Sequence, residues 1–138
     1  QEVPMSESYA ALQASYGRCT RQRGFITSFY GRLLARDERV EKMFSHTDWT
    51  KQNKALRRGI SIALTYAGGS NIVEQSMKEM AEVHSRQGRV PVDPILYTYW
   101  RESLLETVRE FDPKLTPGLE KRWSEALRKT TDFFADRY

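Results

Sequence analysis

Apolar residues recur three and four positions apart throughout this chain, in each segment that lies between glycine and proline breakers. Such spacing places them on one face of an α-helix, and strand-like alternation never extends beyond a few residues. The sequence therefore predicts an all-α fold of about six to seven helices. The helices are expected at residues 6–21, 25–36, 48–67, 71–84, 94–111 and 117 to near the C-terminus, with an irregular stretch at 40–47.

Two of these helices have strong start signals. Asp93 precedes Pro94, and Thr116 precedes Pro117. In each pair, a side chain that can cap a helix stands before a proline, whose fixed φ angle suits the first helical position. We therefore expect a helix to begin at both places.

Composition and charge narrow the class of protein. The 138 residues are 39% hydrophobic, 12% aromatic and 29% charged, which is typical of one soluble globular domain spanning residues 1–138. No run of about 18 apolar residues could span a bilayer, so we expect no membrane segment. The net charge of +4 is spread over helical faces among acids and no nucleic-acid-binding motif occurs, so no nucleic-acid partner is expected. The single cysteine, Cys19, cannot form an internal disulfide, which favours a cytoplasmic protein.

His84 is the residue on which a functional interpretation depends. A lone histidine on an apolar stripe is, by itself, more often a core residue than a metal ligand. Here Met77, Met80 and His84 follow one another at spacings of three and four, on a helix that Asn71 and Glu74 could begin as a capping box. A breaker loop follows directly. Haem iron needs only one such imidazole and an apolar pocket around the porphyrin, so the context favours a ligand.

A set of residues spread over most of the chain forms a wider pattern: Phe29, Tyr30, Phe44, Gln52, Leu56, His84, Tyr97, Leu104 and Leu105. This pattern resembles bacterial single-domain globins and the haem domain of flavohaemoglobins. The spacing from Tyr30 to Phe44 matches these families without a gap. Gln52 needs a shift of one residue, and the segment from His84 to Tyr97 is a few residues longer than in flavohaemoglobins.

The resemblance implies a globin fold whose helices pack around one haem b. It makes His84 the proximal ligand of the iron. It makes Tyr30 and Gln52 the pair that donates hydrogen bonds to a bound diatomic ligand. The other residues expected at the haem are Phe44, Leu56, Met80, Tyr97 and Trp100.

Further expectations concern the edges of this site. Arg86 and Arg89 come directly after His84 and are candidates to pair with haem propionates, whereas His46 is expected to be exposed. Tyr138 stands where flavohaemoglobins carry a glutamate that makes the proximal histidine a stronger electron donor. That effect, and the peroxidase-like activity that depends on it, are therefore in doubt.

The resemblance leaves more than one function open. The leading one is binding of dioxygen, and also of nitric oxide and carbon monoxide, for storage, transport or scavenging. The second is nitric oxide detoxification by a dioxygenase, an enzyme that would take its electrons from a separate reductase. A sensor and a haem-free helical bundle are further alternatives. We expect a bacterial, cytoplasmic protein that is a monomer or a weak homodimer.

Overall fold

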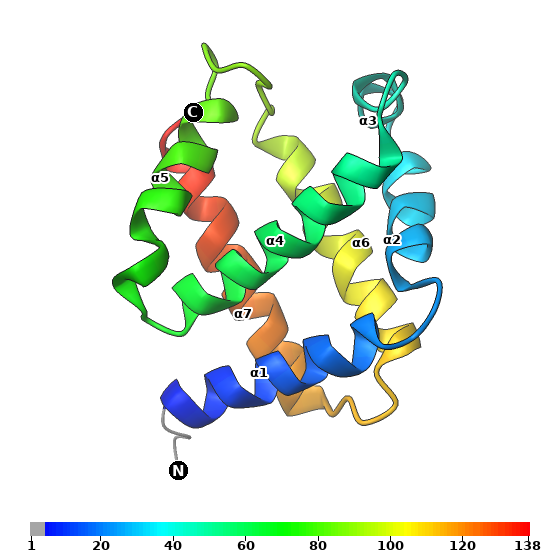
Figure 1. The fold of residues 1–138 in the computed structure, drawn as a ribbon, viewed down its shortest axis with the longest axis vertical. Coiled ribbons are helices and arrows are strands. Elements are labelled where there is room, and N and C mark those ends of the chain that lie inside the picture. The colour runs from blue at the N-terminus through cyan, green and yellow to red at the C-terminus, as the bar shows by residue number, and fades with distance from the viewer. Residues whose placement is uncertain (1–4) are drawn as a thin grey trace.

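The computed structural model describes residues 5–138, which form seven α-helices, one 3₁₀ turn and no strand. The elements are α1 (Met5–Thr20), α2 (Phe25–Leu34), α3 (Glu38–Met43), α4 (Trp49–Ala67), η1 (Asn71–Val73), α5 (Glu74–Val83), α6 (Ile95–Phe111) and α7 (Pro117–Asp136). The expected all-α class is confirmed. Figure 1 shows α4 crossing in front of α6 and α7, with α2 and α5 on either side. None of these helices has the length and hydropathy needed to span a membrane.

The two helix starts predicted at the proline pairs are confirmed. The Asp93 carboxylate accepts a hydrogen bond from the backbone N–H of Ile95 at 3.1 Å. The Thr116 hydroxyl accepts one from the N–H of Leu119, also at 3.1 Å, and Pro117 lies in the first turn of α7. These side chains satisfy backbone donors that have no partner within the first helical turn.

The stretch expected to be irregular contains a short helix, α3. Its start is fixed by Asp37, whose carboxylate accepts a hydrogen bond from the N–H of Arg39 at 2.7 Å. A helix of 6 residues has too few turns to show a periodic spacing of apolar residues. Only the capping residue Asp37 could have indicated this helix in the sequence.

The start of the helix before His84 also differs from the prediction. Asn71 is not its cap. The Ser70 hydroxyl accepts a hydrogen bond from the N–H of Ile72, and residues 71–73 form the 3₁₀ turn η1 before α5 begins. A 3₁₀ turn is a common entry to an α-helix, and here the side-chain cap belongs to that turn, so the expected capping box does not form.

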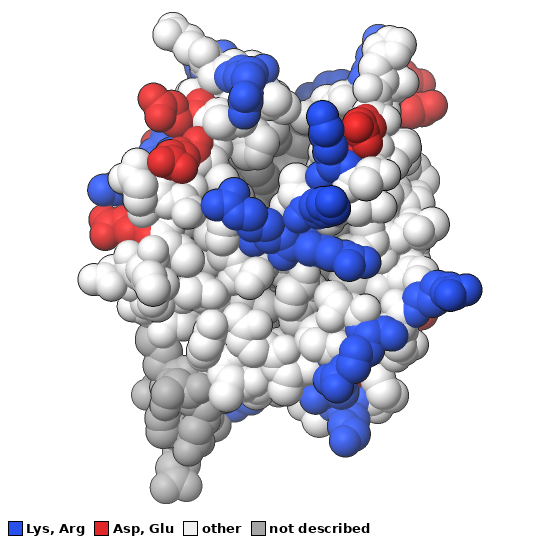
Figure 2. Space-filling view, in the orientation of Figure 1, with Lys and Arg blue, Asp and Glu red and all other residues white. Residues whose placement is uncertain are grey.

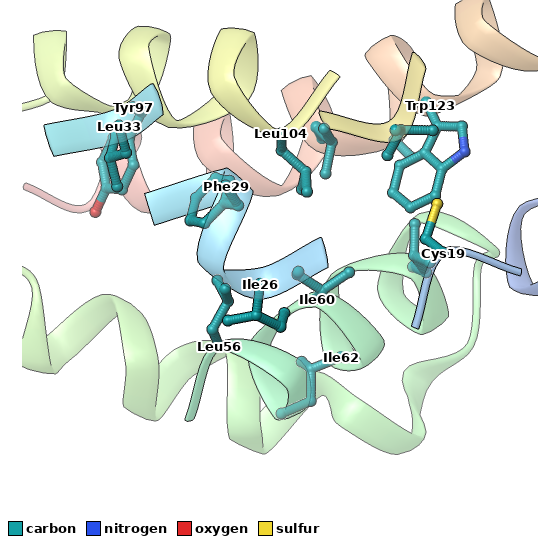
Figure 3. Packing of buried hydrophobic residues seen from close by; sticks show 14 of the residues in the cluster. Cys19, Ile26, Phe29, Leu33, Leu56, Ile60, Ile62, Tyr97, Leu104 and Trp123 are labelled. Atoms are coloured by element: carbon teal, nitrogen blue, oxygen red, sulfur yellow. The ribbon is translucent and has the colours of Figure 1, made fainter. Parts of the chain in front are cut away.

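The core forms where α2, α4, α6 and α7 meet. Phe29, Ile60, Leu104 and Trp123, one from each of these helices, are fully buried (Figure 3). Trp123 donates a hydrogen bond from its indole nitrogen to the Ser15 hydroxyl at 2.8 Å, so its polar atom is satisfied inside the core. Each such apolar side chain stabilises the fold by about 1.5–3 kcal/mol relative to exposure.

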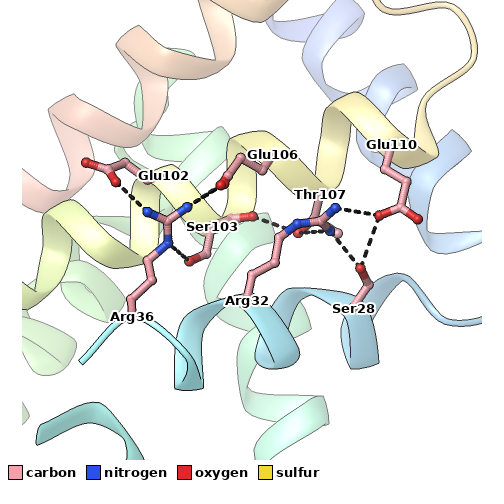
Figure 4. A network of polar contacts seen from close by, with 8 residues as sticks. All are labelled: Ser28, Arg32, Arg36, Glu102, Ser103, Glu106, Thr107 and Glu110. Atoms are coloured by element: carbon pink, nitrogen blue, oxygen red, sulfur yellow. Dashed lines mark hydrogen bonds and ion pairs between the residues drawn. The ribbon is translucent and has the colours of Figure 1, made fainter. Parts of the chain in front are cut away.

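Polar contacts tie α2 to α6 along one side of the molecule (Figure 4). Arg32 donates hydrogen bonds to the Thr107 hydroxyl at 3.2 Å and to the Glu110 carboxylate at 2.6 Å. Arg36 donates to the Ser103 hydroxyl at 2.9 Å and pairs with two further carboxylates of α6. Both helices contribute residues predicted at the functional site, so this network helps to fix the distance between them.

Candidate functional site

A cavity of about 590 Å³ lies inside the bundle, bordered by α4, α6, the end of α5 and the loop between α5 and α6. This volume is in the range of about 300–1,000 Å³ found for small-molecule and cofactor sites. Figure 2 shows the surface hollowed near that loop. Seven of the eight residues predicted for the site line the cavity: Phe44, Gln52, Leu56, Met80, His84, Tyr97 and Trp100.

His84 lies at the C-terminal end of α5 with its imidazole held by the loop that follows. Its Nδ1 is 3.0 Å from the carbonyl oxygen of Val90. A carbonyl can only accept, so Nδ1 carries the hydrogen and Nε2 keeps the lone pair that binds a metal. The N–H of Val92 donates to the His84 carbonyl at 3.1 Å, which closes the loop against the helix end.

An aromatic side chain of α7 packs against the imidazole and also contacts an aromatic side chain of α6. The ring of Phe134 stands edge-on to His84, with 6.2 Å between centroids, and 5.9 Å from the ring of Tyr97. Burial raises the pKa of Tyr97 well above its usual value, and the nearby phenol of Tyr138 adds to the shift. Tyr97 is therefore a neutral hydrogen-bond donor at any physiological pH.

Tyr30, the eighth predicted residue, does not line the cavity but is connected to it. Gln52 borders the cavity and donates a hydrogen bond from Nε2 to the Tyr30 phenol oxygen at 3.0 Å. Tyr30 is buried, and burial raises its pKa to about 12 although the Gln52 bond acts in the other direction. The phenol therefore keeps its hydrogen and can still donate it.

Two aromatic rings from outside α2 pack against Tyr30. Phe44 lies 5.6 Å and Trp49 lies 4.9 Å from its ring, both edge-on, and these two rings stack on each other at 5.8 Å. Trp49 was not among the residues predicted for the site. The signal in the sequence that could have indicated Trp49 is its position directly after Asp48, the N-cap of α4. The cap fixes where the helix begins and therefore the direction in which side chains of its first turn point.

The charged residues that line the cavity are two arginines, Arg58 of α4 and Arg89 of the α5–α6 loop. Of the two arginines expected near propionates, only Arg89 borders the cavity. The guanidinium of Arg86 instead lies 4.8 Å from the ring centroid of Tyr138. His46 is exposed, as expected, and is not a lining residue.

These residues fit the haem that the sequence resemblance implies. The cavity is mainly apolar, and the His84 imidazole lines it. The bond to Val90 involves Nδ1 of this imidazole and leaves Nε2 available for a metal. Among the side chains of residues 9–138, no group of three or more His, Cys, Asp or Glu could hold a bare metal ion. A metal at His84 would therefore need its other ligands from a cofactor, as a porphyrin provides.

Comparison with known proteins identifies the fold. No protein-family model and no curated protein sequence matches this chain. Its structure is similar to the crystal structure of a protein from Pseudomonas aeruginosa PAO1 described as structurally highly homologous to a human hemoglobin. The two chains are 29% identical, with a TM-score of 0.87 over 95% of this chain and 98% of the other. The predicted globin fold is confirmed, whereas the finer likeness to flavohaemoglobins stays a prediction.

Proposed function

We propose that this globin-fold chain binds one haem b in its cavity through His84 and uses it to bind dioxygen beside Gln52 and Tyr30. One observation carries the proposal. His84 and Gln52 border the same apolar cavity, and Gln52 is already bonded to the buried Tyr30 phenol. The His84 imidazole and the Gln52 amide thus border one apolar cavity, and the Tyr30 phenol is bonded directly behind the amide. A haem with a polar gaseous ligand requires an imidazole on one side and a hydrogen-bond donor on the other.

The proximal side depends on how His84 is held. Haem, when bound, supplies an iron that takes one imidazole nitrogen and leaves a coordination position for a small ligand. The Val90 carbonyl fixes the tautomer of His84 and the direction of its ring. Because this acceptor is a neutral carbonyl and not a carboxylate, it makes the imidazole only a moderate electron donor. This favours reversible ligand binding over peroxidase-like chemistry.

The distal side depends on Gln52 and Tyr30. Both are donors at physiological pH, since the pKa of Tyr30 is about 12 and an amide does not titrate. In an apolar surrounding, each hydrogen bond to a ligand that gains negative charge on binding contributes about 1–3 kcal/mol. Dioxygen gains such charge and carbon monoxide gains much less. The pair therefore favours dioxygen.

The test is haem retention in two histidine variants of the full chain. His84→Ala is expected to lose haem or to hold it loosely with an altered Soret band, because the imidazole on the cavity wall is gone. His46→Ala is the matched control, since His46 is exposed and does not line the cavity. Haem content and absorption spectra are compared after identical purification and haem loading. Equal retention in both variants would contradict the proposal.

A further inference from the structure

We infer that Trp49 is a positioning residue for dioxygen binding: its indole keeps the Tyr30 phenol directed toward the cavity and separates it from solvent. The inference rests on the proposed function and deepens it, because it names a side chain outside the cavity on which the hydrogen bond from Tyr30 depends. Trp49 is not among the residues that line the cavity, so it acts on the ligand only through Tyr30.

Three aromatic rings form a closed triangle at the corner of the molecule where α2, α3 and the start of α4 meet (Figure 1). Trp49 stands edge-on to Tyr30 with 4.9 Å between ring centroids, and it stacks on Phe44 with 5.8 Å between centroids and 17° between planes. Phe44 lies 5.6 Å from Tyr30. All three distances are in the range of about 4.5–7 Å that attractive aromatic pairs adopt. Because each ring contacts the other two, Trp49 restricts the Tyr30 ring from a direction that Phe44 does not cover.

The exposure of the three rings shows which of them faces solvent. Trp49 is 39% exposed, whereas Tyr30 is only 5% exposed. Phe44 is half-buried and lines the cavity. The triangle therefore reaches from the cavity wall to the surface, with Trp49 as its outer member. Removing the indole opens Tyr30 to water, which competes for the phenol hydrogen and weakens any bond that the phenol makes in the apolar interior.

The first turn of α4 holds Tyr30 in two different ways. Asp48 fixes where this turn lies, because its carboxylate accepts a hydrogen bond from the backbone N–H of Thr50 at 3.1 Å. Trp49 and Gln52 are three residues apart and lie on one face of the helix. Gln52 holds the phenol oxygen by a hydrogen bond, and Trp49 packs against the ring. One hydrogen bond from a flexible amide leaves the tyrosine free to change its χ1 rotamer, so the packing contact selects the direction of the ring.

The experiment measures dioxygen release from the haem-loaded full chain by stopped flow. Trp49→Ala removes the indole, and Trp49→Phe is the conservative variant that keeps an aromatic ring at this place. Thr50→Ala is the matched control, because it changes the next exposed residue of the same turn. Trp49→Ala is also made in a chain that carries Tyr30→Phe. This double variant separates an effect that depends on the phenol from any other effect of the indole on the pocket.

We expect Trp49→Ala to release dioxygen at least about fivefold faster than the wild type, the lower end of the range for loss of one hydrogen bond to the ligand. Trp49→Phe should restore most of the slow release, and Thr50→Ala should release dioxygen at the wild-type rate. In the Tyr30→Phe chain, Trp49→Ala should change the rate by less than about twofold, because no phenol remains to be positioned. An acceleration that is equal with and without the phenol would overturn the inference.

A second measurement on the same haem-loaded proteins does not depend on dioxygen. Tetranitromethane nitrates tyrosines whose phenols are accessible to it, and peptide mass spectrometry shows which tyrosine is modified. Tyr30 should be nitrated slowly in the wild type and in Trp49→Phe, and much faster in Trp49→Ala, with Tyr138 of the same chain as the internal reference. Equally slow nitration of Tyr30 in a folded Trp49→Ala chain also overturns the inference. Failure of the wild-type chain to take up haem would instead contradict the proposed function.

Discussion

Gln52 donates a hydrogen bond to the Tyr30 phenol across 3.0 Å and so joins the first turns of α4 to the middle of α2. This bond makes the two residues that we propose as dioxygen-binding donors one unit. Gln52 borders the cavity while Tyr30 lies behind it, enclosed by Phe44 and Trp49. A change at either residue therefore alters the orientation of the other as well as the number of donors.

The phenols of Tyr16, which is partly buried, and of Tyr30, which is buried, make the stability of the fold sensitive to alkaline pH. Burial raises the pKa of each to about 12, from an ordinary value of 10.0. Between these values the unfolded chain loses phenol protons that the folded chain keeps, so raising the pH favours unfolding. The contribution of these two phenols to the free energy of unfolding should be constant at neutral pH and should fall as the pH rises through 10 toward 12. Urea titrations across this range measure it.

The control for this effect is Tyr30→Phe, which removes one of the phenols whose pKa is raised. Its free energy of unfolding should fall less steeply with pH than that of the wild type over the same alkaline range. Identical slopes would mean that Tyr30 ionises in the folded protein as readily as in the unfolded chain.

The helix pattern could be predicted from sequence wherever a local signal determined it. The helix starts at Pro94 and Pro117 were predicted because a cap and a proline act within one turn. The helix at 38–43 was missed because six residues carry no readable period, and only the cap at Asp37 marked it. Ser70 and Asn71 are neighbouring polar residues that could each cap a helix, and in the structure Ser70 is the cap.

Side chains that line the cavity could be predicted from the sequence, but the backbone contacts around them could not. His84, Gln52 and Leu56 were found because helical spacing and a family resemblance both indicated them. The acceptor for the His84 imidazole is the carbonyl of Val90, and a backbone carbonyl has no signature in sequence. Arg58 was not predicted to line the cavity for a different reason. The helix α4 carries several cations, and the sequence does not show which of them lies beside the cavity, because the cavity is formed only in the folded chain.

The buried carboxylate of Asp112 should make Arg18 important for stability. The Asp112 side chain is 0% exposed and accepts hydrogen bonds from Arg18 Nε at 2.6 Å and from the Ser15 hydroxyl at 2.6 Å. Arg18→Met leaves that charge without its cation. We expect a loss of about 2–4 kcal/mol in the free energy of unfolding, below the full range for buried pairs because water can reach the partly exposed arginine.

Urea denaturation of Arg18→Met and Arg109→Met at neutral pH measures this difference. Arg109 pairs with Glu120 at the surface, with a side chain that is 54% exposed, so its loss should cost less than about 1 kcal/mol. Burial alone would raise the pKa of Asp112, but the bonds from Arg18 and Ser15 hold it below its ordinary value. The stabilisation is therefore present above pH 4 and is lost as the pH falls further. Equal losses in the two variants would refute the assignment.

Gly59 gives a test of the cavity that leaves His84 unchanged. It lies on the cavity wall, and a Cβ there would meet the Met80 methyl group at 3.8 Å, an ordinary contact. Gly59→Ala should keep its haem and gain about 0.5–1 kcal/mol in helix stability.

Gly59→Phe should fold but take up less haem, because its ring would occupy part of the cavity. Gly31→Phe is the control, since Gly31 is exposed with nothing near its Cβ. Equal haem content in both Phe variants would place the cofactor elsewhere.

The last prediction concerns dioxygen release from the Tyr30→Phe, Gln52→Leu and double variants, measured by stopped flow. Tyr30→Phe keeps the packed ring and deletes one donor of about 1–3 kcal/mol, so release should be roughly 5- to 150-fold faster. Gln52→Leu should act in the same direction but more weakly. Because the two side chains are bonded to each other, the double variant should release dioxygen more slowly than the product of the single effects predicts. Carbon monoxide release is the control and should change far less. If Tyr30→Phe changes the dioxygen rate by less than a factor of about two, the phenol does not act on the ligand, and Trp100, on the cavity wall, becomes the next donor to test.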